Sequence, residues 1–454
     1  MKICVISGSP KGKNSITFQT VKYIALNHPE CEFATLHVGQ KIRSYEKDMS
    51  AALETVNRAD ILLFCYPVYT FLVPCQLHRF IELLKESGVD LSGKCAAQIT
   101  TSKHFYDTTA HAFIRENCAD LGLRYLGGLS ADMDDLTKPE GQDEALDFWE
   151  LVCRRALTQY AEPYFMPEAK PLEDYRRMYE FFDESPKNEG KEAVIVADLR
   201  EGDTDLSNMI ADFQARFPYP SRVVNIADYP FSGGCLGCFN CAVSGKCIYK
   251  DGFDDFLRNE IQTADAIVYA FRIKDHSMGA QMKMFDDRQF CNGHRTVTMG
   301  SPVAYLVRGD LAAEPNLRMV IEGRADVGRN FLAGIATDNT NMGAMIESLA
   351  YAIDREITLP QTFLGVGGMK IFRDLIWIMQ GMMKADHEFY LEHGMYDFPQ
   401  KEKATILKMK AVGAMIANPK VKAKMGNKMT EGMLMPYTKV LKKCAKELRR
   451  AQEE

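Results

Sequence analysis

The feature that most constrains this chain is an internal repeat. Residues 59–82 (ADILLFCYPVYTFLVPCQLHRFIE) and 264–287 (ADAIVYAFRIKDHSMGAQMKMFDD) align without a gap at a constant offset of 205 residues. The apolar run at 2–6 matches the run at 192–196, where the offset is 190, so the second copy has 15 extra residues between about 197 and 264. Solenoid repeats have periods of about 20 to 50 residues, so a repeat this long indicates duplicated domains.

Each copy alternates short runs of Val, Ile and Leu with longer helical patterns, which is typical of βαβ units around a buried parallel sheet. In the first copy we expect strands near 2–6, 32–38, 60–65, 95–100 and 124–128. We expect helices near 15–27, 49–58, 74–86, 106–121 and 141–160. The predicted fold class is α/β, with two tandem flavodoxin-like doubly wound parallel-sheet domains and a helical C-terminal extension.

The pattern also predicts where the domains begin and end. We expect a first domain at 1–165, a proline-rich linker at 166–190, a degenerate second domain with a cysteine-rich insertion at 191–360, and a helical, Met-rich, basic extension at 361–454.

Composition excludes several function classes. Lys and Arg number 55 against 61 Asp and Glu, and this net charge of -6 does not favour nucleic acid as a partner. No apolar run is long enough for a signal-peptide core or a membrane span, so we expect a cytoplasmic protein. Thirteen cysteines, an odd number, do not indicate a disulfide framework.

The loop after the first strand, Ser7 to Ser15 (SGSPKGKNS), leads directly into a helix. A glycine-containing loop at a helix N-terminus presents unpaired backbone N–H groups and a positive dipole end, which favour an anion such as phosphate. The loop matches neither the P-loop nor the GxGxxG fingerprint. A Ser/Gly-rich turn with an ordinary helix cap is the alternative. The side chains that would help to hold a phosphate are Ser9, Lys11, Asn14, Ser15 and Thr17.

Two further loops follow neighbouring strands of the predicted sheet. Tyr66 to Phe71 (YPVYTF) ends the third strand, and Thr100 to Tyr106 (TTSKHFY) ends the fourth. Ligands of open parallel sheets bind outside the carboxyl ends of the strands, so the three loops should converge. A phosphate loop, an aromatic loop and a polar loop together favour a phosphorylated planar ring as the ligand.

At these residues the first copy resembles the flavodoxin-like family of NAD(P)H-dependent FMN reductases and iron-sulfur flavoproteins. The motifs that carry the resemblance are Gly8 to Lys11, Pro67-Val68-Tyr69, and Asp135 to Gly141. The resemblance implies FMN, with its phosphate on Ser9, Lys11, Asn14, Ser15 and Thr17. It implies that the isoalloxazine ring is held by Pro67, Val68, Tyr69, Thr70 and Phe71 and by Thr100, Thr101 and Ser102.

The second copy has lost these motifs. Its first loop, Ala197 to Asp203 (ADLREGD), places acidic residues where a phosphate would lie, and Arg272-Ile273-Lys274 replaces Pro67-Val68-Tyr69. We therefore expect one FMN per chain, bound by the first copy.

The second copy has a cysteine motif instead, in which Cys235, Cys238, Cys241 and Cys247 lie within 13 residues. Three cysteines at x2 spacing followed by a fourth favour a [4Fe-4S] cluster. Structural zinc, whose cysteines usually fall into two separated pairs, and free or redox-active thiols are the alternatives. In the iron-sulfur flavoproteins that the chain resembles, such a cluster lies beside an FMN. Here the two cofactors would come from two halves of one chain or from two chains of a dimer.

The remaining cysteines and the C-terminus are less informative. Cys4, Cys65, Cys75 and Cys95 lie in apolar contexts and are expected to pack in the core, as is Cys291. Residues 401–454 have a local net charge of +9, which favours a solvated basic surface over a membrane-surface role.

These observations predict an FMN-dependent, NAD(P)H-linked oxidoreductase that passes electrons between FMN and a [4Fe-4S] cluster. The expected partners are NAD(P)H or a protein electron donor, a small-molecule or protein acceptor, and a second copy of the chain. The alternatives are an electron carrier without its own substrate and a cluster-free FMN reductase with a dimerisation domain. No catalytic residue is assigned; His104, Tyr106 and Asp107 are candidates for proton supply.

Overall fold

The computed structural model describes the chain except for residues 160–163, 166, 176–186, 397–401, 426–427 and 454. The chain divides into two compact units. The first unit comprises Met1–Met166, Cys235–Gly237 and Lys420–Glu454, and the second comprises Pro167–Gly234 and Cys238–Pro419. Both the cysteine-rich segment and the C-terminal region cross from one unit to the other. The predicted boundaries at 165, 190 and 360 remain predictions.

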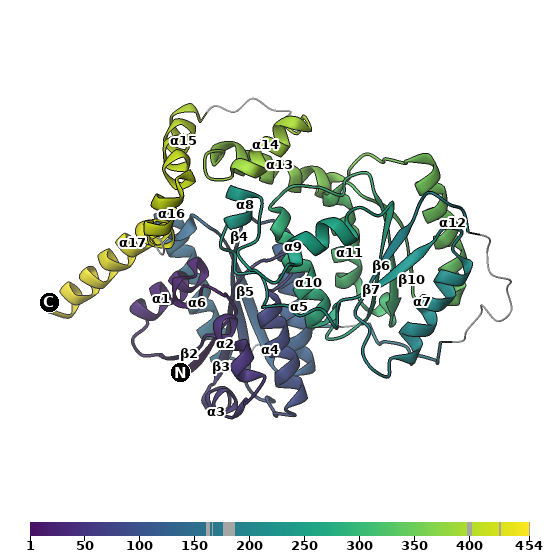
Figure 1. The fold of residues 1–454 in the computed structure, drawn as a ribbon. Coiled ribbons are helices and arrows are strands. Elements are labelled where there is room, and N and C mark those ends of the chain that lie inside the picture. Colours follow the sequence, from purple (N-terminus) through teal and green to yellow (C-terminus); the bar gives the residue numbers. More distant parts are fainter. Residues whose placement is uncertain (160–163, 166, 176–186, 397–401, 426–427, 454) are drawn as a thin grey trace. The chain divides into compact units, whose positions relative to one another are not determined.

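The first unit contains a five-stranded parallel sheet in the order β2-β1-β3-β4-β5 (Figure 1). Its strands are β1 (Lys2–Ser7), β2 (Glu32–Leu36), β3 (Ile61–Pro67), β4 (Cys95–Ser102) and β5 (Arg124–Asp132). β1 and β3 consist largely of buried apolar residues, because helices cover both faces of a doubly wound sheet. All five predicted strands are confirmed.

The strands are connected by the helices α1 (Ile16–Asn27), α2 (Val38–Tyr45), α3 (Ser50–Arg58), α4 (Cys75–Glu86) and α5 (Asp107–Asp120), and α6 (Pro139–Leu157) follows β5. On one face of the sheet, Val21 and Ile24 of α1 and Trp149 of α6 pack against Val5 and Leu63. The five predicted helices are confirmed, and α2 was not predicted.

The second unit repeats the same strand order. Its sheet runs β10-β9-β8-β6-β7 and is parallel throughout. The strands are β6 (Ala193–Ala197), β7 (Ser221–Asn225), β8 (Ala266–Arg272), β9 (Pro302–Arg308) and β10 (Phe331–Ala336). The β7–β8 connection spans 226–265, whereas the matching β2–β3 connection spans 37–60. The extra length of the second copy therefore lies in the connection that contains the cysteine motif.

Helices of the second unit surround this sheet and continue beyond it. The helices between its strands and directly after β10 are α7 (Thr204–Arg216), α8 (Asn240–Ser244), α9 (Phe253–Phe256), α10 (Gly279–Arg288), α11 (Pro315–Gly328) and α12 (Asn339–Arg355). The following helices are α13 (Phe363–Ile378), α14 (Lys384–Glu392) and α15 (Lys403–Ala417), which confirms the helical extension. Among the described residues, no helix has both the length and the apolar character needed to cross a membrane.

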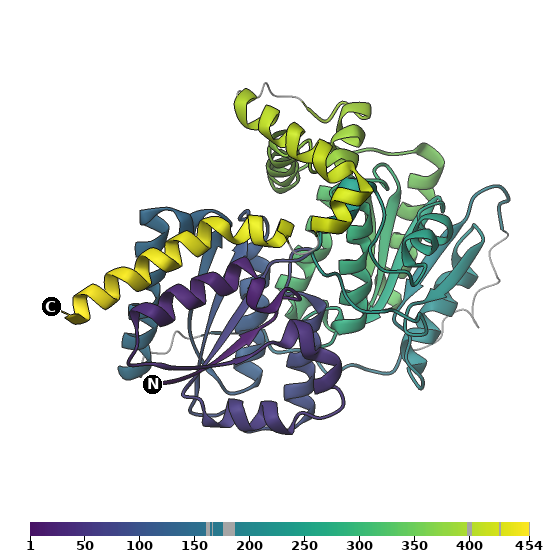
Figure 2. The same cartoon turned by 60° about the vertical axis from the view of Figure 1, so that its left-hand side comes forward.

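The chain ends with α16 (Pro419–Met425) and the long helix α17 (Lys428–Glu453). α17 belongs to the first unit and lies alongside α1 (Figure 2). Tyr437 and Cys444 of α17 pack with Tyr23 of α1 and with Leu136, which follows β5.

The backbone after the third strand of each sheet confirms the repeat. Thr70 and Phe71 have positive φ angles of 39° and 72°, and their counterparts Asp275 and His276 have φ angles of 52° and 61°. Both loops close with reciprocal backbone hydrogen bonds, between Tyr69 and Leu72 and between Lys274 and Ser277. Two successive left-handed residues without glycine are uncommon, so this conformation has persisted while the side chains changed.

Candidate functional site

The loop between β1 and α1 is a tight turn held by its own backbone. The Gly12 N–H donates to the Ser9 carbonyl oxygen at 3.0 Å, and the Ser15 N–H donates to the Gly12 carbonyl oxygen at 2.9 Å. The Lys11 N–H also donates to Ser9 Oγ at 3.3 Å. The side chains of Ser9 and Ser15 are buried, so the loop surrounds the N-terminus of α1 closely.

The N-terminus of α1 retains unused hydrogen-bonding groups. Among the described residues, the Ser15 side chain makes no capping hydrogen bond, although serine is a favoured cap. Thr17 Oγ1 is buried and finds no hydrogen-bond partner within the described part of the chain. A buried hydroxyl without a partner is costly, so its presence beside a helix N-terminus fits an anion that would accept from it.

The loops after β3 and β4 leave the same edge of the sheet. Pro67 pairs with Thr101 across the two strands, and the Val68 N–H donates to the Thr101 carbonyl oxygen at 3.2 Å. The Phe71 ring is buried and contacts the rings of Phe105 and Tyr106, with centroid distances of 5.1 and 4.1 Å. Phe71 therefore forms a packed aromatic base for this loop.

The polar residues at the end of β4 differ in how they are satisfied. Thr100 Oγ1 lies 2.8 Å from His111 Nε2, and Ser102 Oγ accepts from the His104 N–H at 2.8 Å. Thr101 Oγ1 is buried and has no hydrogen-bond partner in the described structure. Thr101 thus provides a second buried hydroxyl at the same edge as Thr17.

A further group at this edge was only partly predicted. His104 Nδ1 lies 3.1 Å from Asp107 Oδ2, and Ser130 Oγ of β5 donates to the same carboxylate oxygen. Burial tends to raise the pKa of Asp107, but its hydrogen bonds to Ser130 and His104 leave that pKa below the ordinary value. The sequence analysis named His104 and Asp107 but missed Ser130, which lies in a strand that carried no motif.

The strand order brings the three loops together. β1, β3 and β4 are adjacent in the sheet, and the order reverses between β1 and β3. Ligands of doubly wound sheets bind at such a switch point, outside the carboxyl ends of the strands. The thirteen residues predicted to contact FMN all lie at the carboxyl ends of β3 and β4, in the loops that follow β1 and β3, or at the start of α1.

The corresponding position of the second unit is filled by its own side chains. Asp203 Oδ1 accepts from the Leu206 N–H at 3.3 Å and so caps α7. The same carboxylate binds Arg272 through two contacts of 2.6 and 3.2 Å. Nearby, Arg308 binds Asp205 at 2.9 Å. A carboxylate held by arginine therefore caps the helix of the second unit, whereas the Ser15 side chain at the N-terminus of α1 makes no described capping hydrogen bond.

The start of the cysteine segment belongs to the first unit. Gln76 Nε2 of α4 donates to the Cys235 carbonyl oxygen at 3.5 Å. Gly237 has a φ of +58°, and a β-carbon on it would overlap Tyr69 Oη and lie 3.8 Å from Lys11 Cε. The Gly237 N–H points to Cys235 Sγ at 3.5 Å. Cys235–Gly237 is therefore packed against the loop that contains Lys11 and the loop that contains Tyr69.

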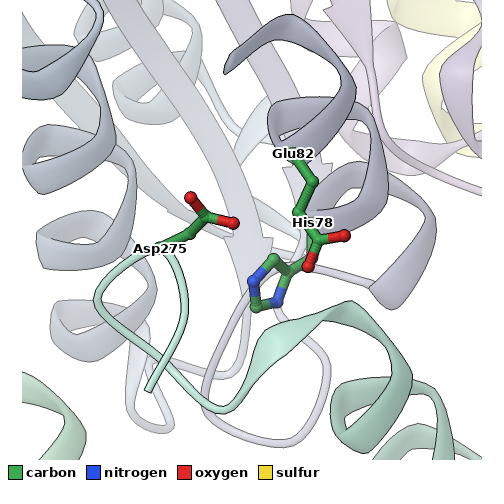
Figure 3. Close-up of side chains that lie close together, drawn as sticks. All are labelled: His78, Glu82 and Asp275. Atoms are coloured by element: carbon green, nitrogen blue, oxygen red, sulfur yellow. The ribbon is translucent and has the colours of Figure 1, made fainter. Parts of the chain in front are cut away.

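α4 also contains a buried polar pair that the sequence analysis did not single out. His78 and Glu82 lie one turn apart on this helix (Figure 3). The His78 ring packs on Phe113 with a centroid distance of 4.7 Å, and Glu82 binds Arg79 at 2.7 Å. The sequence predicted this helix, but no motif in it identified the pair.

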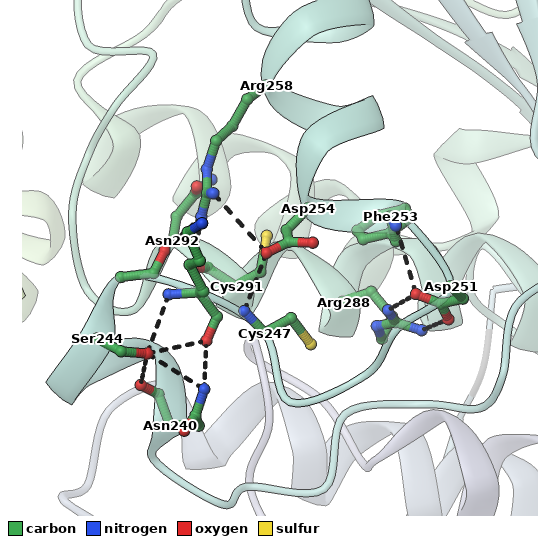
Figure 4. Close-up of polar contacts among 12 residues, drawn as sticks. Asn240, Ser244, Cys247, Asp251, Phe253, Asp254, Arg258, Arg288, Cys291 and Asn292 are labelled. Atoms are coloured by element: carbon green, nitrogen blue, oxygen red, sulfur yellow. Dashed lines mark hydrogen bonds and ion pairs between the residues drawn. The ribbon is translucent and has the colours of Figure 1, made fainter. Parts of the chain in front are cut away.

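The other three cysteines of the motif lie in the second unit: Cys238 precedes α8, Cys241 is within it, and Cys247 follows it. Burial raises the pKa of Cys241 to about 12, with Asp386, Cys238 and Cys247 adding to the shift. The Cys247 N–H donates to Asp254 Oδ2 at 3.1 Å (Figure 4). Among the described residues, which include all thirteen cysteines, no disulfide is formed.

A buried ion pair and a buried contact between a carboxylate and a histidine support this part of the second unit. Arg288 and Asp251 form paired contacts of 2.8 Å (Figure 4). Arg288 also donates to the Gly233 carbonyl oxygen at 2.9 Å. Asp386 of α14 is fully buried and lies 3.0 Å from His294 Nδ1. α14 packs against α8, the helix of Cys241. The cysteine segment is thus anchored by residues far apart in the sequence.

The donor set of this segment fits an iron-sulfur cluster. Four thiols lie within 13 residues, and Gly237, Phe239 and Gly245 have positive φ angles that let the backbone turn sharply. An N–H directed at a cysteine sulfur, as at Cys235, is a contact that tunes such clusters. Cys291 is buried, as expected, and burial raises its pKa to about 12.

Comparison with known proteins finds similarity over part of the chain. Residues 1–126 match the model of the NADPH-dependent FMN reductase family. An iron-sulfur flavoprotein from Archaeoglobus fulgidus is 27% identical over 173 residues, which are 35% of this chain and 78% of that protein. The match confirms the resemblance found in the sequence and the expected enzyme class, a flavin-dependent oxidoreductase linked to NAD(P)H.

Solved structures with partial similarity include two oxidoreductases. An FMN-dependent NADH-azoreductase from Bacillus anthracis in complex with FMN has 15% identity and a TM-score of 0.27, and covers 35% of this chain and 98% of its own. An NAD(P)H:quinone oxidoreductase from Methanothermobacter marburgensis has 12% identity and a TM-score of 0.28, and covers 36% of this chain and 98% of its own.

Proposed function

We propose that the chain is an NAD(P)H-linked oxidoreductase in which FMN, bound by the first unit, exchanges electrons with a [4Fe-4S] cluster held by Cys235, Cys238, Cys241 and Cys247. The observation that carries the proposal is the packing of Cys235–Gly237 in the first unit, where Gly237 meets Tyr69 and Lys11. One proposed cluster ligand therefore belongs to the same unit as the flavin loops.

The FMN phosphate would be held at the N-terminus of α1. Ser9, Asn14, Ser15 and Thr17 would provide hydrogen-bond donors, and Lys11 would provide positive charge. The buried, unpartnered Thr17 Oγ1 supports this assignment, because a bound phosphate would satisfy it. Hydrogen bonds to a charged group contribute roughly 1.5–3 kcal/mol each.

The flavin ring would lie against the loops of Pro67 to Phe71 and Thr100 to Ser102. Thr101 Oγ1, buried without a partner among the described residues, supports a polar ring edge in this place. Tyr69 would separate the ring from Gly237. His104, whose Nδ1 lies 3.1 Å from Asp107 Oδ2, would be a candidate for exchanging protons with solvent or substrate through its other nitrogen.

FMN accepts a hydride as an electron pair and releases electrons singly, which suits a cluster that takes one at a time. The name of the Archaeoglobus fulgidus relative, an iron-sulfur flavoprotein, supports the pairing of the two cofactors.

Metal and flavin analysis tests the proposal. Anaerobically purified protein is expected to contain FMN, with about four iron and four acid-labile sulfide per chain. Replacing Cys238 and Cys241 with Ser should remove the iron and the broad visible absorbance of the cluster while the flavin bands remain. Cys153→Ser, in α6, is the matched control and should retain both cofactors. Unchanged iron in the double variant would refute the cluster assignment.

A further inference from the structure

The last helix of the chain is amphipathic, and its apolar side is already buried. Leu434, Tyr437, Leu441, Cys444 and Leu448 recur at helical spacing and pack against α1 and the segment after β5. The Tyr437 hydroxyl donates to the Met133 carbonyl oxygen, and Asn27 Nδ2 donates to Cys444 Sγ at 3.1 Å. These contacts fix which side of α17 faces α1. Figure 2 shows the two helices lying side by side.

The opposite side of α17 is a basic stripe. We define the basic stripe as Lys439, Lys442, Lys443, Lys446, Arg449 and Arg450, all of which are exposed. Their spacing places them on successive turns of one helix face. Between Lys439 and Arg450 the sequence contains one acidic residue, Glu447, which lies 3.8 Å from Lys443.

This distribution of charge is unfavourable for an isolated helix. Like charges three and four residues apart repel each other, and a solvated helix avoids this by interspersing acidic residues. The stripe instead gathers cations in a chain whose net charge is -6. The packing of α17 on α1 must offset this repulsion. Because the positive charge does not stabilise the helix, the basic stripe has a role other than stability.

The position of α17 connects the stripe to the flavin edge of the sheet. The Tyr437 hydroxyl is hydrogen-bonded to the carbonyl oxygen of Met133, which directly follows Asp132 at the carboxyl end of β5. α17 then continues along α1 to Cys444 beside Asn27. The N-terminal end of the stripe therefore starts near the edge at which the phosphate, aromatic and polar loops converge.

The chemistry of the stripe distinguishes among anionic partners. A helix that lies on a membrane presents apolar residues to the lipid, but the apolar side of α17 is occupied by α1. A long nucleic acid needs more basic surface than one helix provides, but residues 1–400 carry 41 Lys and Arg against 56 Asp and Glu. A small acidic protein can meet the stripe alone, so charge complementarity favours it.

We propose that the basic stripe docks a small acidic protein that carries single electrons to or from the flavin unit. The proposal rests on the proposed function, because it supplies the external partner of the flavin and the cluster. Association through such a surface is steered by charge and weakens as salt rises.

Binding to an acidic flavodoxin, used as the probe, tests the proposal. The stripe variant Lys439→Glu, Lys442→Glu and Lys446→Glu is compared with the matched control Lys2→Glu, Lys41→Glu and Lys47→Glu, which changes the net charge equally at exposed positions of the same unit. The affinity of the stripe variant is expected to fall at least about tenfold at low salt, while that of the control stays within about twofold. Circular dichroism and thermal unfolding check that both variants fold.

Several outcomes would overturn the proposal. Equal losses of affinity in both variants, an affinity that does not depend on salt, or no binding of the flavodoxin by the wild-type chain would each do so. Stripe-dependent binding to phosphatidylglycerol vesicles or to duplex DNA, without binding to the flavodoxin, would also do so. Flavin and iron contents are measured on the same samples. If purified wild-type protein contained no FMN but still bound the flavodoxin through the stripe, the proposed function would be refuted and the docking surface would not.

Discussion

Tyr69 Oη occupies the space that a β-carbon on Gly237 would need, so the aromatic loop of the first unit and the cysteine segment pack at a glycine. Gly237 also has a φ of +58°, a backbone angle that residues other than glycine rarely adopt. Two independent constraints therefore require glycine at this position, and both act where one proposed cofactor site meets a ligand of the other.

Gly237→Ala is expected to lower the free energy of unfolding by more than the cost of placing alanine in a left-handed backbone conformation. The left-handed conformation alone costs roughly 1–2 kcal/mol for alanine, and the overlap with Tyr69 adds to it. Gly88→Ala is the matched control, because its φ is +65° and no described atom lies within 4 Å of the added carbon. Urea unfolding should show the larger loss for Gly237→Ala, and Tyr69→Ala should recover part of it. Equal losses at the two glycines would contradict the contact.

The strands and most helices of the first unit could be predicted from the sequence because buried parallel strands are continuous apolar runs. α2 could not, because its sequence VGQKIRSY is short and polar and the His37 side chain makes no described capping bond to mark its start. The contact of Tyr69 with Gly237 joins residues far apart in sequence, and no local pattern reports such a contact. Acidic residues were predicted at the lost phosphate site, but the pairing of Asp203 with Arg272 required the fold.

Negative charge at the proposed phosphate site should abolish flavin binding. Replacing both Ser9 and Ser15 with Asp removes two donors and adds repulsion of about 1–4 kcal/mol for each charge at about 4 Å, depending on the effective dielectric constant. Ser207→Asp, at an exposed position of α7 in the second unit, is the control. Flavin released by heating should be absent from the double variant and unchanged in the control. Equal flavin in all three proteins would show that the phosphate lies elsewhere.

The filled position in the second unit leads us to expect one FMN per chain. Asp203→Ala removes a helix cap, which should lower the free energy of unfolding by about 0.5–2 kcal/mol. It should not create a second flavin site, since Arg272 and Lys274 still replace the apolar Pro67 and Tyr69. Ser15→Ala provides the comparison: without flavin it should change stability little, because Ser15 makes no described capping bond. Two FMN per wild-type chain would refute this division.

The carboxylate of Asp386 should affect the reduction potential of the proposed cluster. It is buried next to α8, and its charge contributes to the raised pKa of Cys241. Asp386→Asn removes a negative charge and should raise the potential; a residual interaction of about 1 kcal/mol corresponds to roughly 40 mV for a one-electron couple. Asp374→Asn, at a half-exposed carboxylate of α13, is the control. A redox titration that shows equal potentials for both variants would exclude this influence.

The stability of the first unit should depend on pH through His111. Burial lowers the pKa of His111 to about 4, while Asp107 opposes the shift. The ordinary histidine pKa is about 6.5, so the unfolded chain binds more protons in the interval below that value. The stability contributed by neutral His111 is therefore fully present above pH ~6.5 and is lost as the pH falls toward about 4. His111→Gln keeps a polar group near Thr100 but cannot be protonated, so its free energy of unfolding should fall less steeply over this interval. Urea titrations at several pH values measure the slope, and equal slopes for the variant and the wild-type chain would show that His111 ionises normally in the folded protein.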